Sequence, residues 1–330
     1  MLQLKNATPF AAAFSLFRNE QGIDTLYTMV KSTFNIGPQW TLHNQQQPLQ
    51  ETDVFWGDPQ SSSLRHASDY HLGKSATDII MLGSACAPDQ RAVQQMDVSL
   101  RVGTVGKTIR VFGDRYWRQG QISYPEPFTH MPLVYERAFG GVDERSGQVR
   151  GAESRNPVGR GYVGRKSRSE VEGMALPNLE CPSQLIRDLD DMPAPACFAP
   201  VAGHWQPRSS MAGTYDDAWQ QTRAPYLPED YQQRFMNVAH PDLIYPGFLK
   251  GGEEVNIQGM HPSGNLNFLL PQIKLTNRIT LDDQSHSSQF ALETLLLEPN
   301  QLSLSMVWRA AMPCDKKMLK IKQIFISLSR

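Results

Sequence analysis

The residues with the clearest chemical potential in this sequence are basic side chains crowded into the middle of the chain. Between Arg145 and Glu170, seven lysine and arginine residues stand against two acidic ones, which gives a local charge of +5. The seven are Arg145, Arg150, Arg155, Arg160, Arg165, Lys166 and Arg168. Guanidinium groups form paired hydrogen bonds with carboxylates and phosphates. We interpret the segment as a surface loop whose arginines hold irregular backbone, or alternatively as a docking surface, with Tyr162, for an acidic partner.

The same segment contains a G-x-G-x-x-G match at Gly159, Gly161 and Gly164. Dinucleotide binding requires these glycines between a strand and a helix, so that the helix N-terminus meets the pyrophosphate. Neither an apolar strand before the match nor an apolar helix after it is present. The pattern therefore indicates a turn-rich loop.

Metal and nucleophile signatures are weak. The eight histidines include no H-E-x-x-H or H-x-H spacing, and His240-Pro241-Asp242 is more typical of a turn than of a ligand pair. The four cysteines form no C-x-x-C, which predicts free thiols, and the chain contains no G-x-S-x-G elbow. We expect neither a metal nor a cofactor.

A third group combines charged and aromatic residues at strand ends. Gly113-Asp114-Arg115-x-Trp117 could orient a ligand, but a buried ion pair that locks a turn is the favoured interpretation. The same structural role is expected for Trp205 with Arg208 and for Tyr215 with Trp219.

Two other functions remain open from the residues alone. One is a carboxylate-dependent hydrolase acting on sugars or peptides through Asp114, Glu136 and Glu180, which would need two carboxylates about 5–9 Å apart in a pocket. The other is a β-sandwich ligand-binding module with a concave, aromatic-lined face.

Strands must position most of these residues. Period-two alternation and β-branched or aromatic residues predict them near both ends of the chain. The expected strands span 25–34, 78–82, 93–102, 107–112, 254–260, 266–270, 274–281, 291–297, 302–308 and 320–327. The third and fourth, linked by residues 103–106, give the clearest hairpin signal. Residues 10–17 are expected to form a core strand or strand pair and not a secretion signal.

The middle of the chain has no such periodicity. Twelve of the 23 prolines lie between Pro125 and Pro228, so regular elements there must be short. Large aromatic residues recur through the same region, and disordered segments lack such anchors. We therefore expect an irregular but ordered middle, with short helices around residues 183–189 and 231–239.

Length and composition indicate a folded protein with two domains or one large one. The 330 residues carry a net charge of −1, are 40% hydrophobic and include no apolar run long enough to span a membrane. A nucleic-acid or membrane-surface partner is disfavoured, because such partners require a basic excess. The predicted architecture is mainly β, one domain over 1–330, with antiparallel, sandwich-like sheets from residues 1–120 and 236–330 around the ordered middle, 121–235. The expected location is the cytoplasm.

At this point a resemblance emerges from ordered motifs along nearly the whole chain. Among them are Asn6-x-Thr8-Pro9-Phe10, Gly113-Asp114-Arg115-x-Trp117, Tyr135-Glu136-Arg137-Ala138-Phe139-Gly140-Gly141, Asn156-Pro157-x-Gly159-x-Gly161, Leu176-Pro177-Asn178-x-Glu180-x-Pro182, Trp205-x-Pro207-Arg208 and Gly213-Thr214-Tyr215-Asp216-x-x-Trp219. They resemble a family of uncharacterised domains found beside type VI secretion effector genes in Gram-negative bacteria. The chain departs from the family pattern at His240-Pro241-Asp242-Leu243.

The resemblance implies a cytoplasmic adaptor or chaperone and not an enzyme. Members of that family bind a cognate toxin effector and help to load it onto the secretion spike or its tip. The family has no catalytic signature that can be transferred to residues of this chain. We expect the partner-binding surface to be the basic segment with Tyr162.

Overall fold

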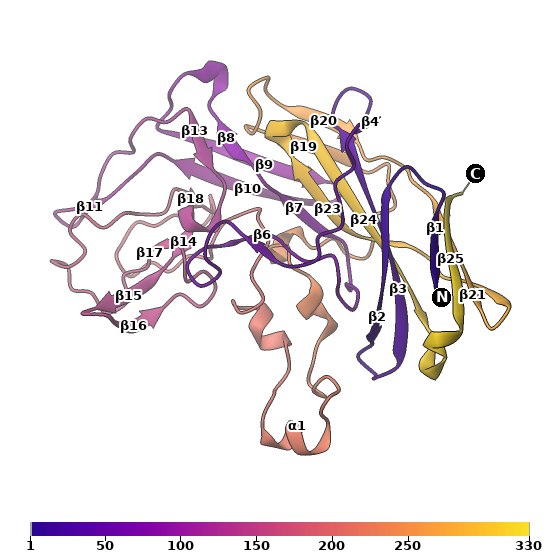
Figure 1. Ribbon diagram of the computed structural model, residues 1–330. Coiled ribbons are helices and arrows are strands. Elements are labelled where there is room, and N and C mark those ends of the chain that lie inside the picture. Colours follow the sequence, from indigo (N-terminus) through magenta and orange to yellow (C-terminus); the bar gives the residue numbers. More distant parts are fainter. Residues whose placement is uncertain (1, 330) are drawn as a thin grey trace.

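The longest run of strand-forming residues becomes the strand on which the central sheet is built. In the computed structural model, which describes residues 2–329, this strand pairs on one side with a C-terminal strand and on the other with the strand preceding it. The sheet has the order β2-β3-β24-β23-β7, with β4 attached to the end of β3 (Figure 1). Its strands are β2 (Ala11–Arg18), β3 (Asp24–Asn35), β4 (Thr41–Leu42), β7 (Asp78–Met81), β23 (Ala291–Glu298) and β24 (Ser303–Pro313).

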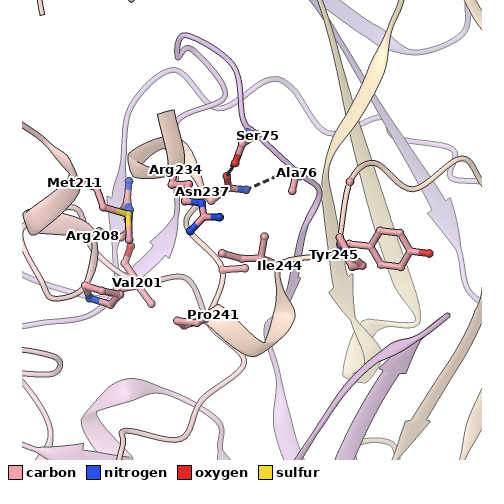
Figure 2. A pocket seen from close by; sticks show the side chains of 14 residues that line it. Ser75, Ala76, Val201, Arg208, Met211, Arg234, Asn237, Pro241, Ile244 and Tyr245 are labelled. Carbon is pink, nitrogen blue, oxygen red and sulfur yellow. Dashed lines mark hydrogen bonds between the residues drawn. The ribbon is translucent and has the colours of Figure 1, made fainter. Parts of the chain in front are cut away.

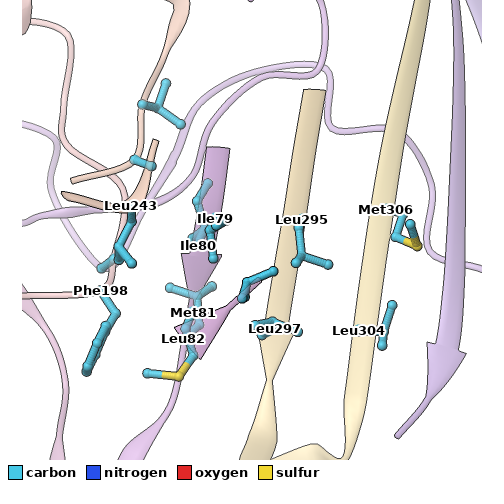
Figure 3. Close-up of a cluster of buried hydrophobic side chains, with 14 of the residues drawn as sticks. Ile79, Ile80, Met81, Leu82, Phe198, Leu243, Leu295, Leu297, Leu304 and Met306 are labelled. Carbon is cyan, nitrogen blue, oxygen red and sulfur yellow. The ribbon is translucent and has the colours of Figure 1, made fainter. Parts of the chain in front are cut away.

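Side-chain alternation gives this sheet one apolar and one polar face. Because residues opposite each other in register share a face, pairs such as Val30 with Trp308 and Phe34 with Leu304 extend the apolar face across strands. Figure 3 shows its continuation over β24, β23 and β7. The side chains there are Leu304 and Met306, Leu295 and Leu297, and Ile79 and Met81, all buried.

Buried charges occupy the opposite face. Arg309 of β24 donates to Glu293 of β23 at 2.7 Å, and Lys31 of β3 lies 3.2 Å from Asp69. All four side chains are at most about one-tenth exposed. Buried charges are tolerated only when paired and hydrogen-bonded, so residues 67–75, which supply Asp69, must cover this face.

Two further sheets complete the fold. A five-stranded sheet has the order β18-β10-β9-β19-β20, and a four-stranded sheet has the order β1-β25-β21-β22. The first contains β9 (Gln95–Val102), β10 (Val105–Phe112), β18 (Leu179–Glu180), β19 (Glu254–Gln258) and β20 (Leu266–Leu269). The second contains β1 (Gln3–Asn6), β21 (Leu275–Leu281), β22 (Gln284–Ser287) and β25 (Ile321–Leu328). The β9–β10 pair is the predicted hairpin, with Val102 opposite Val105.

One hydrophobic core joins the three sheets, and a smaller core lies in the middle of the chain. The main core combines buried side chains from both ends of the sequence, such as Phe34, Val98 and Ile324. The smaller core contains Trp117, Phe139, Val171, Leu176 and Ile186. The mainly β, antiparallel fold class predicted from the sequence is therefore confirmed, and residues 11–18 form the expected core-packed strand.

The remaining elements are short and lie largely in the irregular middle. The two-stranded pairs are β5 (Val54–Phe55) with β6 (Leu64–His66), β8 (Ser84–Cys86) with β13 (His130–Pro132), β11 (Trp117–Arg118) with β12 (Gln121–Ile122), β14 (Phe139–Gly140) with β17 (Arg160–Gly161), and β15 (Val142–Arg145) with β16 (Gln148–Ala152). Single 3-10 turns span Pro88–Gln90, Tyr135–Arg137, Arg208–Met211, Gln233–Met236, Pro241–Leu243, Pro299–Gln301 and Asp315–Lys320.

A projecting arm, residues 207–235, carries the α-helix α1 (Asp217–Thr222) away from the sheets (Figure 1). The helix begins where the Asp216 side chain accepts from the backbone NH of Trp219, a standard N-cap. The sequence prediction missed this helix. The helix expected around 231–239 is only a 3-10 turn, Gln233–Met236.

The prediction of a helix around residues 183–189 is wrong. Residues 181–190 contain turns without a helix. The backbone NH of Ile186 donates instead to the Glu180 carboxylate at 2.8 Å, and the Ile186 side chain enters the smaller core. Tertiary contacts thus replace helical hydrogen bonds here.

The four cysteines are free, as predicted. No helix formed within residues 2–329 combines the length and apolar character that a membrane crossing requires.

The base of the arm is fixed to the central sheet by Asp78 of β7, which is fully buried. Its carboxylate accepts from the Asn237 side chain at 2.9 Å and from the backbone NH of Val238 at 2.8 Å. Lys74 lies 2.7 Å from the same group and is itself 3% exposed. Asp78 therefore joins the sheet, the covering segment and the chain that returns from the arm.

We predict that Asp78→Ala lowers the free energy of unfolding by about 3–5 kcal/mol, because it leaves the Lys74 ammonium buried without its counter-charge. Urea unfolding followed by tryptophan fluorescence measures the change. The matched control is Asp282→Ala, which breaks an ion pair with Lys320 that is more than half exposed and is expected to cost less than about 1 kcal/mol. Equal losses in the two variants would contradict the assigned role.

Candidate functional site

The Asp114–Arg115 pair holds the fold through two separate partners. Asp114 accepts from Arg137 at 3.0 Å and from Asn178 at 2.9 Å. Arg115, buried over the Phe112 ring, bonds to Glu180 and to the carbonyl of Pro177. The two neighbours therefore do not pair with each other. Burial raises the pKa of Glu180, and the Arg115 charge partly offsets this effect.

The other motif residues are structural or lie on the arm. Trp117 is in the smaller core, and Trp205 packs edge-on against Tyr135 at 5.5 Å. Tyr215 and Trp219 pack together at the tip of the arm, 4.8 Å apart.

The three carboxylates considered for hydrolysis are held in different places. Glu180 is buried against Arg115, and Asp114 is bonded to Arg137. Glu136 accepts from the backbone NH and the hydroxyl of Ser63, both at 2.7 Å. It lines a cavity of about 450 Å³ beside Trp56 and Glu298.

A single carboxylate organises much of the basic segment. Asp143 of β15 is fully buried and accepts from the backbone NH of Arg165 at 2.9 Å and from Arg150 at 3.0 Å. Lys166 lies 3.3 Å away. The Arg165 NH bond, followed by the Arg150 and Lys166 contacts, holds the pKa of Asp143 below its usual range. A Cβ at Gly164, where φ is +61°, would lie 2.6 Å from the Asp143 Cβ, so only glycine permits this approach.

Two more arginines of the segment also bind within the molecule. Arg155 forms a two-pronged bond with Glu153, with both distances 2.7 Å, and also reaches the Pro193 carbonyl. Arg160 donates to the Glu136 carbonyl at 2.9 Å. These contacts agree with the first interpretation, in which arginines hold irregular backbone.

Three basic side chains remain turned to solvent. Arg145 is 66% exposed, and its ion pair with Glu170 is long, at 3.7 Å. Arg165 and Arg168 are also exposed. No side chain of the described residues pairs with the guanidinium of Arg165 or Arg168. Tyr162 is half-buried against the smaller core. The basic surface is therefore smaller than the sequence suggests, and we define it as Arg145, Arg165 and Arg168.

A groove that the sequence did not predict lies at the base of the arm. It consists of a cavity of about 520 Å³ and a second of about 470 Å³, which share the lining residues Val201, Pro207 and Pro241. Figure 2 shows the first cavity, with side chains from the arm on one side and residues of 241–247 on the other. We call these two cavities the arm-base groove. Apolar concave surfaces of this volume are typical of binding sites.

Charged groups of the second cavity are largely satisfied. Lys107 bonds to Asp242 at 2.7 Å, and burial with the nearby Lys107 charge lowers the pKa of His240 to about 4. Neutral His240 caps the turn Pro241–Leu243 by accepting from the Asp242 NH at 3.2 Å. The Tyr135 hydroxyl, by contrast, is buried and hydrogen-bonds to no described residue.

Within residues 2–329, no cluster of three or more His, Cys, Asp and Glu residues could hold a metal ion.

Comparison with known proteins gives one family. The family model described as "Uncharacterized protein conserved in bacteria (DUF2169)" matches residues 21–309, which covers the whole middle and most of both strand-rich ends. No curated protein and no solved structure matches the chain.

We predict that Asp143→Ala loosens the basic segment, since it removes the acceptor for Arg150, Lys166 and the Arg165 NH. Limited trypsin digestion should cut faster after Arg150, Arg165 and Lys166, as identified by mass spectrometry. Glu144→Ala, at an exposed neighbouring position, is the control and should digest at the wild-type rate. Unchanged cleavage in Asp143→Ala would refute the organising role.

A second prediction concerns acid stability. Because His240 titrates near 4 in the folded chain and near 6.5 when unfolded, the unfolded state binds more protons in this window. Stability due to His240 is therefore lost as pH falls from 6.5 to 4, by up to about 1.4 kcal/mol per pH unit. His240→Asn retains a capping oxygen and should flatten the dependence of unfolding free energy on pH. Identical slopes for both proteins would contradict this account.

Proposed function

The chain belongs to the DUF2169 family of proteins conserved in bacteria, and from that premise we propose that it is a cytoplasmic adaptor or chaperone of a Gram-negative bacterium. It binds a cognate toxin effector of the type VI secretion system and promotes loading of that effector onto the secretion spike or its tip. The motif resemblance described above supports this proposal. An adaptor of this kind has to contact two proteins.

The observation that carries the proposal is a pair of chemically opposite surfaces on separate projections. The β15–β16 hairpin and the loop after it present the basic surface, with Val149 of the hairpin 63% exposed. The outer part of the arm is acidic, since residues 213–231 contain four acidic residues and one arginine. Figure 1 shows the hairpin and α1 at different places on the molecule. Two partners of opposite charge can therefore bind without competing.

The arm tip combines charge with the residue types that dominate interface energetics. Tyr215 is 54% exposed and Tyr226 is 41% exposed. The side chain of Glu229, three residues after Tyr226, is 87% exposed. Tyrosine, tryptophan and arginine are enriched among interface hot spots. We define the acidic arm surface as Tyr215, Asp217, Tyr226 and Glu229.

The arm is held in one conformation before any partner arrives. The Trp219 indole donates to the Tyr226 carbonyl at 2.8 Å, and Asp230 accepts from the NH and hydroxyl of Thr214 at 2.9 and 2.7 Å. Arg18, at the end of β2, lies over the Tyr226 ring at 5.2 Å. Preorganisation of this kind lowers the entropic cost of association.

We predict that the two surfaces separate the two partners in a tagged pull-down from native cells, followed by mass spectrometry. The basic-surface variant is Arg145→Glu/Arg165→Glu/Arg168→Glu, and the arm variant is Tyr215→Ala/Asp217→Gln/Glu229→Lys. The recovered amount of one partner, toxin or spike protein, should fall at least about tenfold in the first variant. Recovery of the other partner should fall by at least the same factor in the second variant. The lost charges and aromatic contacts are the reason, and melting temperatures should stay close to wild type. The matched control is Lys5→Glu/Lys274→Glu/Arg278→Glu, at exposed positions in the four-stranded sheet or directly before its strand β21.

Two results would overturn the proposal. One is wild-type protein that recovers neither a toxin nor a spike component from cells expressing both. The other is full recovery of both partners by both surface variants.

A further inference from the structure

The first cavity of the arm-base groove is apolar because its polar walls bond to each other. The Asn237 side chain donates to the Ala76 carbonyl and to Asp78, and accepts from the hydroxyl of Ser75 at 2.8 Å. These bonds use both the NH2 group and the oxygen of the Asn237 amide. What faces the cavity is therefore mostly hydrocarbon, including Met211, Ile244 and Pro241.

Arg208 is likewise committed to the protein. It donates to the Val201 carbonyl at 2.6 Å and twice to the Phe235 carbonyl, at 3.1 and 2.8 Å. Its guanidinium also stacks over the Phe235 ring at 5.0 Å. Burial lowers the pKa of Arg208, as expected for a cation removed from water. Arg208 thus fixes the wall and is not available to a ligand.

Arg234 differs from Arg208 in its exposure and in its lack of partners among the described residues. It is exposed, it lines the same cavity, and no described residue forms a hydrogen bond or ion pair with its guanidinium. Figure 2 shows its side chain turned toward the space between Met211 and Ile244. A free guanidinium beside hydrocarbon is suited to a carboxylate that carries apolar groups next to it.

The second cavity adjoins the first, because Val201, Pro207 and Pro241 line both. An occupant that fills both must be elongated, and an extended chain advances about 3.3 Å per residue. An elongated segment therefore fits the groove better than a compact small molecule.

We propose that the arm-base groove binds an extended internal segment of the partner protein in which a large apolar residue stands next to an aspartate or glutamate. The apolar side chain fills the space between Met211, Ile244 and Pro241, and the carboxylate forms a two-pronged bond with Arg234. The segment then runs over Pro207 and Pro241 into the second cavity. This inference rests on the proposed adaptor function and specifies what the adaptor recognises.

The test uses a phage library of random twelve-residue peptides selected on the full-length protein. We expect enrichment of peptides in which Asp or Glu adjoins Leu, Ile, Met or Phe. Arg234→Glu should abolish the acidic preference, and Arg234→Lys should retain it more weakly because lysine cannot form the two-pronged bond. Arg278→Glu, at an exposed arginine of β21, is the control and should select the same peptides as wild type.

One enriched peptide, labelled with fluorescein, then serves as the probe in fluorescence anisotropy. Its affinity should fall at least about tenfold for Arg234→Glu and be unchanged for Arg278→Glu. Enriched peptides without the acidic–apolar pair, or equal affinity for wild type and Arg234→Glu, would overturn the inference. The pull-down of toxin and spike protein would be unaffected by that result, so failure of this inference is distinguishable from failure of the adaptor proposal.

Discussion

The burial of the Asp78 carboxylate is the constraint on which the rest of the structure depends. β7 is the last strand of the central sheet, and its free edge meets the irregular middle of the chain. There the NH of Met81 donates to the Phe198 carbonyl, and the backbone of Asp78 forms an isolated antiparallel β-bridge with Ile244. A carboxylate removed from water needs nearly every oxygen lone pair satisfied. That requirement brings Lys74, Asn237 and the backbone of Val238 to one point, and so sets where the arm leaves the sheet.

The middle of the chain stays ordered because side chains supply hydrogen bonds to backbone groups that no regular strand or helix pairs. Asn156 donates to the carbonyls of Tyr135 and Phe139, at 2.8 and 2.9 Å. The Asn178 side chain donates to the Phe112 carbonyl, and the Arg160 side chain donates to the Glu136 carbonyl. Buried backbone groups must find partners whether or not a ladder is present. The basic segment is therefore chiefly a source of donors for irregular backbone, and only part of its charge reaches solvent.

Local patterns predicted the strands well, because alternation in β9, β10 and β24 reflects which side chains face the core. They failed where distant residues decide the outcome. The basic segment begins at Arg145, but its main counter-charge, Asp143, lies two residues before it. Asp114, which faces Arg160, comes from a distant part of the sequence. The groove joins residues from Ser75 to Gly247, so no local pattern marks it. The capping residue Asp216 was a usable signal for α1, but six residues give too little periodicity to support it.

The position of the arm-base groove ties recognition to stability. Met211 and Arg234 belong to the arm, whereas Ile244 and Tyr245 follow the segment that Asp78 anchors to β7. A segment lying in the groove therefore adds contacts between two parts of the chain that otherwise meet through a few buried polar groups. Such a ligand binds the folded chain and not the unfolded one, so binding raises the stability of this junction by mass action. The same geometry that makes the arm rigid enough to present its tip thus also makes its base responsive to what occupies the groove.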